Sequence, residues 1–127
     1  MIKIAEATLF VVATPIGNLG DITLRALEIL KGVDVILAED TRETGKLLAG
    51  LNIRNTQKLI SCHDFNESER IDQVKELLNV GQSIALVSDA GTPLISDPGY
   101  KIVNALRNEK FNIVPIPGVS AVITALS

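Results

Sequence analysis

The sequence predicts an α/β fold with a five-stranded, mostly parallel sheet and helices on both of its faces. Short apolar runs rich in β-branched residues alternate along the chain with segments that carry apolar residues at helical spacing. Such alternation builds βαβ units, whose strands run parallel. Hydrophobic residues make up 46% of the 127 residues but aromatic residues only 3%, so Val, Ile, Leu and Ala must form the core. This composition is typical of layered α/β domains.

Five apolar segments are expected to be strands, because each is short and ends at Gly, Pro or charged residues. They are residues 8–13, 33–38, 58–62, 84–87 and 112–116.

A helical pattern follows each expected strand. Asp21 is the expected N-cap of the first helix, which ends at Gly32, and Thr41 is the expected N-cap of the second, which ends near Ala49. The apolar face of the first helix is expected to consist of Ile22, Leu24, Ala26, Leu27, Ile29 and Leu30. The remaining helices are expected over 68–79, from Pro98 onward and from Val119 onward.

Unusual loops follow the strands, whereas the connections from helix to strand are plain. Open parallel sheets bind ligands beyond the carboxyl ends of their strands, so we expect these loops to line one rim. They are residues 14–20, 39–42, 62–67, 88–97 and 117–120. The most prominent is the Gly- and Pro-rich loop after the fourth strand. We expect Asp89 to meet a ligand there, and Asp97 to cap the helix that begins at Pro98.

Several kinds of chemistry are disfavoured. The chain has a single cysteine, Cys62, and a single histidine, His63, so a metal cluster would lack ligands. As neighbours in a strand these two residues would point to opposite faces. For His63 a catalytic role and a hydrogen bond to Asp64 or Asn66 are both possible. No G-x-G-x-x-G is present, which argues against a nicotinamide cofactor. A rim of backbone amides, small residues and carboxylates favours an adenosine-like group-carrier cofactor.

The net charge of −3 argues against a large basic surface for nucleic acid, although Arg42 and Lys46 stand in a locally basic stretch. With no signal-like or membrane-length apolar run and no possible internal disulfide, we expect a cytoplasmic protein that does not enter a membrane. Ser127 falls inside an apolar segment, so the chain either is cut from a longer protein or ends in a fraying terminus.

Five motifs together resemble the amino-terminal domain of the tetrapyrrole methylase superfamily. They are TPIGNLGDIT at 14–23, AEDTR at 38–42, HDFNE at 63–67, SDAGTPLISDPG at 88–99 and PIPGVSA at 115–121. Within the superfamily they are most similar to the branch that methylates a cytidine 2′-oxygen in small-subunit ribosomal RNA.

The resemblance implies S-adenosylmethionine as cofactor, bound in a cleft between two α/β domains. It assigns contact with this cofactor to Pro15, Asp89, Ala90, Gly91, Thr92, Ile95, Ser120 and Ala121. Gly91-Thr92-Pro93 stands where methylases of porphyrin precursors usually carry Gly-Asp-Pro, which disfavours a tetrapyrrole substrate. A tetrapyrrole or other small-molecule methyltransferase, and a non-catalytic nucleotide-binding module, are the alternative functions.

The resemblance also implies that residues 1–127 are only the first domain. The second domain would hold the other half of the cleft, so this domain alone would be inactive. The implied partner is the ribosomal RNA, in the assembled 30S subunit, and the full-length protein would be a homodimer.

The catalytic base is not identified: it is Asp40, His63, Asp89 or a residue of the second domain. We expect Arg42 and Lys46 to contact RNA phosphates. The alternative for Arg42 is a surface salt bridge with Glu39 or Glu43.

Overall fold

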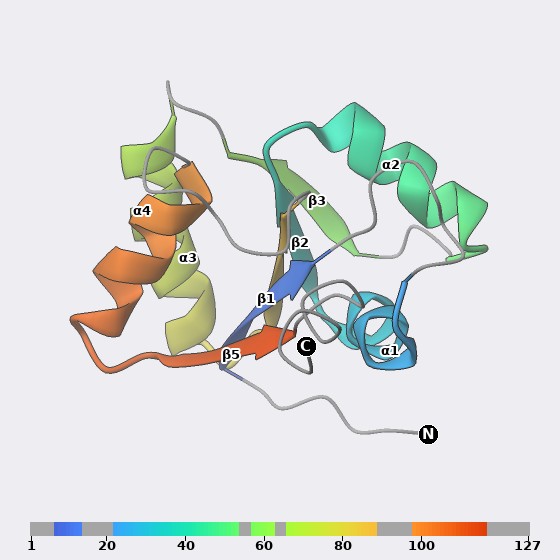
Figure 1. Ribbon diagram of the computed structural model, residues 1–127. Helices are drawn as coiled ribbons and strands as arrows, with labels where there is room; N and C mark the ends of the chain where they lie inside the picture. The colour runs from blue at the N-terminus through green and yellow to red at the C-terminus, as the bar shows by residue number, and fades with distance from the viewer. Residues whose placement is uncertain (1–6, 14–21, 54–56, 63–65, 89–97, 117–127) are drawn as a thin grey trace, which may run out of the picture.

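The computed structural model describes residues 7–13, 22–53, 57–62, 66–88 and 98–116. Strands and helices alternate strictly along these segments, as the sequence pattern predicts (Figure 1). The elements are β1 (Thr8–Ala13), α1 (Leu24–Gly32), β2 (Val35–Ala38), α2 (Thr41–Gly50), β3 (Lys58–Ser61), α3 (Glu67–Asn79), β4 (Ile84–Ser88), α4 (Pro98–Arg107) and β5 (Asn112–Ile116). The helix expected from Val119 onward lies outside the described residues.

The five strands form one sheet in the order β3-β2-β4-β1-β5, and every neighbouring pair is parallel. The predicted fold class is therefore confirmed. β4 lies at the centre of the sheet, between β2 and β1.

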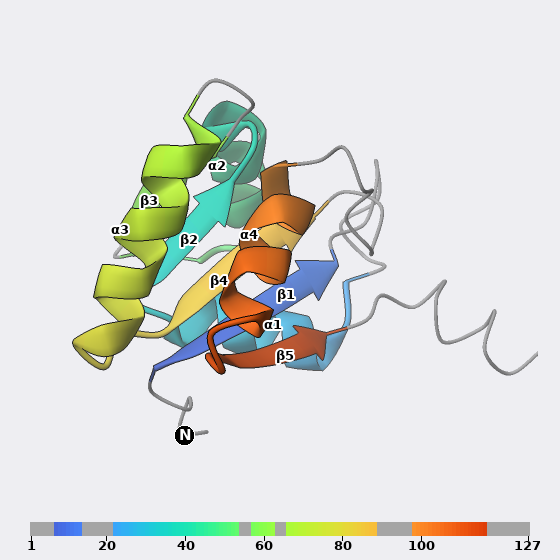
Figure 2. The same ribbon diagram turned by 90° about the vertical axis from the view of Figure 1, so that its left-hand side faces the viewer.

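Helices cover both faces of the sheet. α1 and α2 lie on one face, and α3 and α4 lie side by side on the other (Figures 1 and 2). This division follows from right-handed crossovers, because the connections from β1 to β2 to β3 and those from β3 to β4 to β5 move across the sheet in opposite directions.

Successive side chains of a strand point to opposite faces of the sheet. A separate hydrophobic core therefore forms between the sheet and the helices on each face. Leu9 and Ile84 pack with residues of α3 and α4, such as Val74 and Ile102. Phe10, on the opposite face of β1, belongs to the cluster formed with α1 and α2.

The first two helices begin at different caps from those expected. Thr23 caps α1, and its Oγ1 accepts a hydrogen bond from the Ala26 amide at 3.1 Å; Asp21 lies outside the described residues. Asp40 caps α2 in place of Thr41, because its carboxylate reaches two free amides at the start of the helix. Leu24 is 79% exposed instead of lying on the apolar face, since the buried stripe runs through Ala26, Ile29 and Leu30.

Two strands are shorter than expected. Val33 is the C-cap of α1, and its amide still donates to the Ile29 carbonyl of the last turn, so β2 does not begin until Val35. β3 ends at Ser61, although the Cys62 amide still donates to the Ala38 carbonyl at 2.8 Å.

At the amino edge of the sheet, hydrogen bonds of side chains join neighbouring elements. One carboxylate oxygen of Asp34 accepts from the Ser83 amide at 2.9 Å and from the Ser83 hydroxyl at 3.2 Å, so the starts of β2 and β4 are tied together. Buried Gln57 donates through Nε2 to the Leu30 and Lys31 carbonyls at the end of α1. Within the described segments no helix is long and apolar enough to span a membrane.

Candidate functional site

The carboxyl ends of the five strands lie at one level along the sheet. Ala38, the last residue of β2, pairs with Ser61 of β3 and with Val87 of β4. On the other side of β4, Ala13 pairs with Ser88. The connections that follow these strands therefore start from the same edge, as the sequence predicts for the loops of its rim.

Connections that leave neighbouring central strands lead to opposite faces of the sheet. β4 continues toward α4 on one face, whereas β1 and β2 continue toward α1 and α2 on the other. In open α/β sheets this divergence marks the place where ligands bind. The edge around the end of β4 is therefore the candidate site.

The residues predicted to contact the cofactor all lie outside the described part of the chain. They are Pro15, Asp89, Ala90, Gly91, Thr92, Ile95, Ser120 and Ala121. The register does fix where their segments begin: residue 14 follows Ala13 and residue 89 follows Ser88, and these two strand ends are paired. Residue 117 follows Ile116, which pairs with Val12. The three segments thus start from adjacent strands, and the individual contacts stay predictions.

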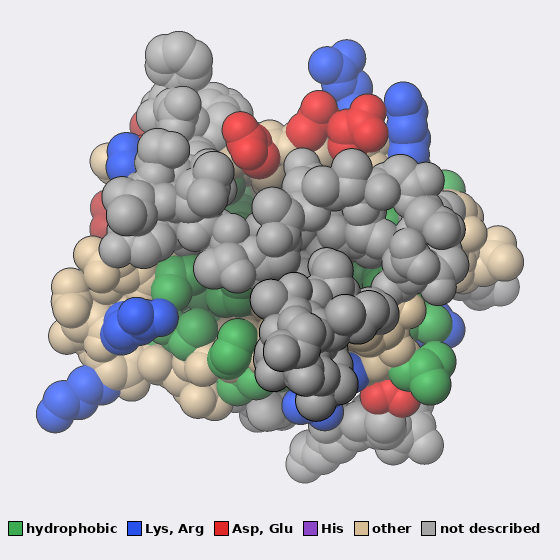
Figure 3. All heavy atoms as spheres, viewed as in Figure 1, with side chains coloured by type: hydrophobic (Ala, Val, Ile, Leu, Met, Phe, Trp, Pro, Cys, Tyr) green, Lys and Arg blue, Asp and Glu red, His purple; other side chains and the backbone are tan. Residues whose placement is uncertain are grey.

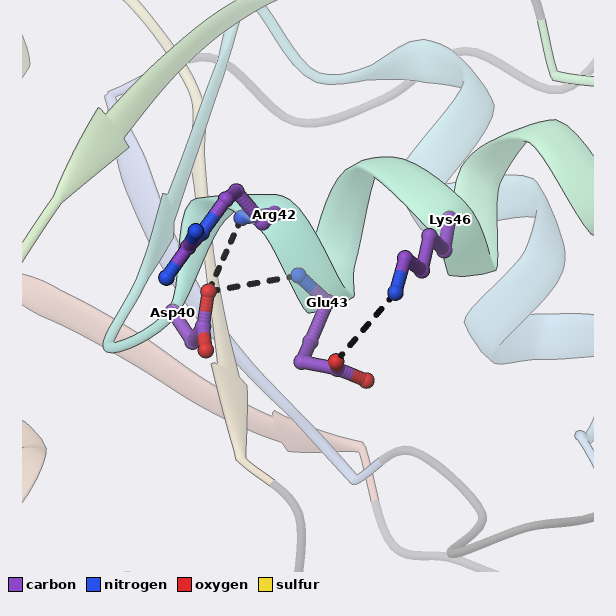
Figure 4. A network of polar contacts seen from close by, with 4 residues as sticks. All are labelled: Asp40, Arg42, Glu43 and Lys46. Atoms are coloured by element: carbon purple, nitrogen blue, oxygen red, sulfur yellow. Dashed lines mark hydrogen bonds and ion pairs between the residues drawn. The ribbon is translucent and has the colours of Figure 1, made fainter.

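Four charged residues surround the start of α2, where one charge is used to cap the helix (Figure 4). Asp40 Oδ1 accepts hydrogen bonds from the Arg42 amide at 3.0 Å and from the Glu43 amide at 3.3 Å. Lys46 Nζ lies 3.8 Å from Glu43 Oε1, and both side chains are largely exposed. Acidic and basic side chains also gather near α2 in the space-filling view (Figure 3).

Arg42 makes no ion pair with Glu39 or Glu43, although all three residues are described and exposed. The alternative of a surface salt bridge at Arg42 is therefore wrong for these partners. Its guanidinium remains accessible to a phosphate, whereas the charge of Lys46 is opposed by Glu43.

Of the three candidate bases in this chain, the structure describes only Asp40. Asp40 lies at the carboxyl edge, but one of its oxygens is engaged in capping α2. His63 and Asp89 lie outside the described residues. Cys62 is buried at 2% exposure in the core beneath α3 and α4, so its side chain belongs to packing. Among the described residues no three His, Cys, Asp or Glu side chains are grouped as a metal site.

Sequence reasoning missed a polar cluster at the start of α3. The Ser61 carbonyl, at the end of β3, accepts from Arg70 Nε at 2.6 Å and from Asn66 Nδ2 at 3.4 Å. Glu67 Oε1 accepts from Lys101 Nζ of α4 at 2.8 Å. The motif HDFNE contains Glu67, but its pairing with Lys101 depends on the adjacency of α3 and α4, which no local pattern reveals.

Fold and edge geometry together define an α/β domain with a parallel sheet, whose candidate site lies at the carboxyl ends of the strands. Residues 8–127 match the family described as Tetrapyrrole (Corrin/Porphyrin) Methylases, and the chain belongs to this family.

Two curated relatives are similar to this chain in sequence over almost its whole length. The chain is 58% identical over 119 residues to the ribosomal RNA small subunit methyltransferase I of Vibrio cholerae, covering 94% of this chain and 41% of the relative. It is 54% identical over 125 residues to the protein of the same name from Escherichia coli O157:H7, covering 97% of this chain and 42% of the relative. The chain thus spans about two fifths of the length of these relatives.

Two solved structures share the fold. A uroporphyrin-III-C-methyltransferase from Thermus thermophilus superposes with a TM-score of 0.67 at 22% identity, over 89% of this chain and 47% of that one. A cobalt precorrin-4 methyltransferase gives a TM-score of 0.70 at 19% identity, over 94% of this chain and 48% of that one. At these identities the likeness concerns the fold alone.

Proposed function

We propose that this chain is the amino-terminal domain of a two-domain methyltransferase that uses S-adenosylmethionine to methylate a cytidine 2′-oxygen in small-subunit ribosomal RNA. The observation that carries the proposal is the 58% identity, over 94% of the chain, to a relative named for methylating this RNA. The assembled 30S subunit is the proposed substrate, a homodimer the proposed state of the full-length protein, and the cytoplasm its proposed location.

The described part of the edge fits an adenosine-like cofactor. The three central strands end in the small residues Ala38, Ser88 and Ala13, so a ligand can approach the sheet edge closely. When bound, S-adenosylmethionine supplies a methyl group already activated on its sulfonium. The contribution required of the protein is then alignment of the donor and the acceptor, together with removal of the hydroxyl proton.

Residues of this chain are assigned to cofactor binding and to phosphate contact, and the proton acceptor is one of several candidates. The cofactor is held at the ends of β4, β1 and β5. The residues that hold it are residues 89–92, Ile95, Pro15, Ser120 and Ala121. Arg42 holds an RNA phosphate, because its guanidinium lies exposed at the same edge without an ion-pair partner among the described residues. Lys46 is a second, weaker phosphate contact. Asp40, His63, Asp89 or a residue of the second domain accepts the ribose proton.

The test uses the full-length protein with 30S subunits that lack the modification and with methyl-labelled cofactor. We expect the label on a ribose oxygen, and therefore in a dinucleotide that resists alkaline hydrolysis, because a 2′-O-methyl group blocks attack on the adjacent phosphate. Label on a base, or on a porphyrin precursor in place of RNA, would overturn the proposed substrate. Binding without turnover would favour a nucleotide-binding module.

A matched pair of variants tests the cofactor segment. Asp89→Asn is expected to weaken cofactor binding by roughly tenfold or more, because it removes a charge from the predicted contact. Asp72→Asn makes the same chemical change at an exposed position of α3 and should leave binding unchanged. Equal affinities of the two variants, measured by calorimetry, would remove Asp89 from the site.

A further inference from the structure

Arg70 lies in the first turn of α3, at the carboxyl edge of the sheet. Its Nε donates to the carbonyl of Ser61, the last residue of β3, at 2.6 Å. Its Nη1 donates to Gln73 Oε1, one turn further along the helix, at 3.1 Å. The side chain as a whole is partly buried. Two hydrogen bonds therefore hold this guanidinium group beside the end of β3.

The positive charge of Arg70 is not neutralised by these contacts, because both acceptors are uncharged. Arg70 makes no ion pair with any residue that the structure describes. Of the acids in the same turn, Glu67 is engaged with Lys101, and Glu69 lies on the exposed side of the helix. A guanidinium carries five N–H donors, of which two are used here, so three remain for a ligand.

A guanidinium group in this state is suited to bind an anion. Its planar arrangement of donors matches the oxygens of a phosphate or a carboxylate. Because the side chain of Arg70 is already held by Ser61 and Gln73, it loses little conformational freedom when an anion binds. The fixed position thus favours binding over that of a cation on a freely rotating side chain.

Arg42 provides a second cation at the end of the neighbouring strand. β2 and β3 end side by side, since Ala38 pairs with Ser61 and the Cys62 amide donates to the Ala38 carbonyl at 2.8 Å. From these ends α2 begins on one face of the sheet and α3 on the other (Figures 1 and 2). Arg42 also makes no ion pair with a described residue. The two arginines therefore flank the paired strand ends from opposite faces.

We propose that Arg70 contacts an RNA phosphate, and that the RNA strand crosses the carboxyl ends of β2 and β3 between Arg70 and Arg42. This inference rests on the proposed function. A nucleic-acid backbone carries phosphates along its whole length, so cations placed apart on its path each bind one of them. β2 is the neighbour of β4 in the sheet, so a strand on this path runs beside the candidate site at the end of β4.

The experiment measures the affinity of the full-length protein for small-subunit ribosomal RNA that lacks the modification, in filter-binding titrations over a series of salt concentrations. Arg70→Gln should make the slope of log affinity against log salt concentration shallower by about 1, as the loss of one phosphate contact does. Arg70→Gln combined with Arg42→Ala should make it shallower by about 2.

Two further variants separate this contact from a structural role and from a general effect of net charge. Arg70→Lys keeps the charge but not the pair of hydrogen bonds to Ser61 and Gln73, so it should retain most of the wild-type slope. Arg107→Gln makes the same chemical change as Arg70→Gln at the exposed end of α4, toward the amino edge, and should leave the slope unchanged. Thermal unfolding identifies the temperature at which every variant is folded.

The outcomes distinguish this inference from the proposed function. If the wild-type protein neither binds nor methylates the RNA, the proposed function fails and the inference fails with it. If the wild type methylates the RNA but Arg70→Gln keeps the wild-type slope, the function stands and Arg70 is not a phosphate contact. Equal losses of affinity in Arg70→Gln and Arg70→Lys at an unchanged slope would show that Arg70 only supports the fold, and would also overturn the inference.

Discussion

The two edges of the sheet use polar side chains in different ways. At the amino edge, Asp34 and Gln57 bond to the backbone of neighbouring elements and close the connections between helices and strands. At the carboxyl edge, Asp40 caps a helix and Glu67 joins two helices through an ion pair. Arg42 makes no ion pair with a described residue. The amino edge thus holds the fold together, whereas the carboxyl edge arranges groups around the candidate site.

The largest effect on stability is expected from Asp34→Ala at the amino edge. This change leaves the amide and hydroxyl of Ser83 without their acceptor, and Ser83 is only 3% exposed. We expect the free energy of unfolding to fall by about 1–3 kcal/mol, measured by urea denaturation. Cofactor affinity should not change at temperatures where the variant is folded. Asp34→Asn, which keeps an acceptor, should lose less; a loss of cofactor affinity without a loss of stability would break the division between the edges.

A smaller effect is expected from Asp40→Ala, because a lost N-cap costs about 1 kcal/mol. Asp40→Asn separates capping from catalysis, since asparagine caps a helix as well as aspartate does but cannot serve as a general base. We expect Asp40→Asn to keep both stability and methyl transfer. A fall in turnover of about 100-fold or more in a stably folded Asp40→Asn variant would instead identify Asp40 as the base.

RNA binding should distinguish the two cations of α2. The affinity for RNA falls as the salt concentration rises. Arg42→Ala is expected to make the slope of log affinity against log salt concentration shallower by about 1, as the loss of one phosphate contact does. Lys46→Ala should change this slope less, because Glu43 already opposes the charge of Lys46. Stability should stay within about 0.5 kcal/mol for both variants. Equal slopes for Arg42→Ala and the wild type, in filter-binding titrations, would exclude Arg42 from the RNA interface.

The smallest effect is expected from Glu43→Gln. Its ion pair with Lys46 is 3.8 Å long and exposed, so its removal should change stability by a few tenths of a kcal/mol at most. The same change releases Lys46 and should strengthen RNA binding slightly at low salt. Weaker binding of RNA by Glu43→Gln would mean that the carboxylate itself contributes to the interface.

Features set by neighbouring residues could be predicted from the sequence, and features set by the order of the strands could not. The β-branched run at 8–13 identifies β1 because a strand depends on its own side-chain pattern. The observed caps lie one or two residues from the expected ones, since Asp40 and Thr41 are both good cap residues and only the backbone decides between them. Which loops begin beside one another depends on the placement of β4 between β2 and β1, and the Glu67–Lys101 pair depends on the resulting contact of α3 with α4.

The position of β1 in the sheet also has a consequence for the synthesis of the protein. β1 is synthesised before β4 and β5, the strands with which it pairs in the described sheet, and the Asn112 side chain that donates to Thr8 lies 104 residues further along the chain. At ordinary rates of translation this separation corresponds to roughly 5 to 20 seconds. Until β4 has been synthesised, the apolar segment TLFVVA has neither of these strand partners, so the nascent chain must keep it from aggregating.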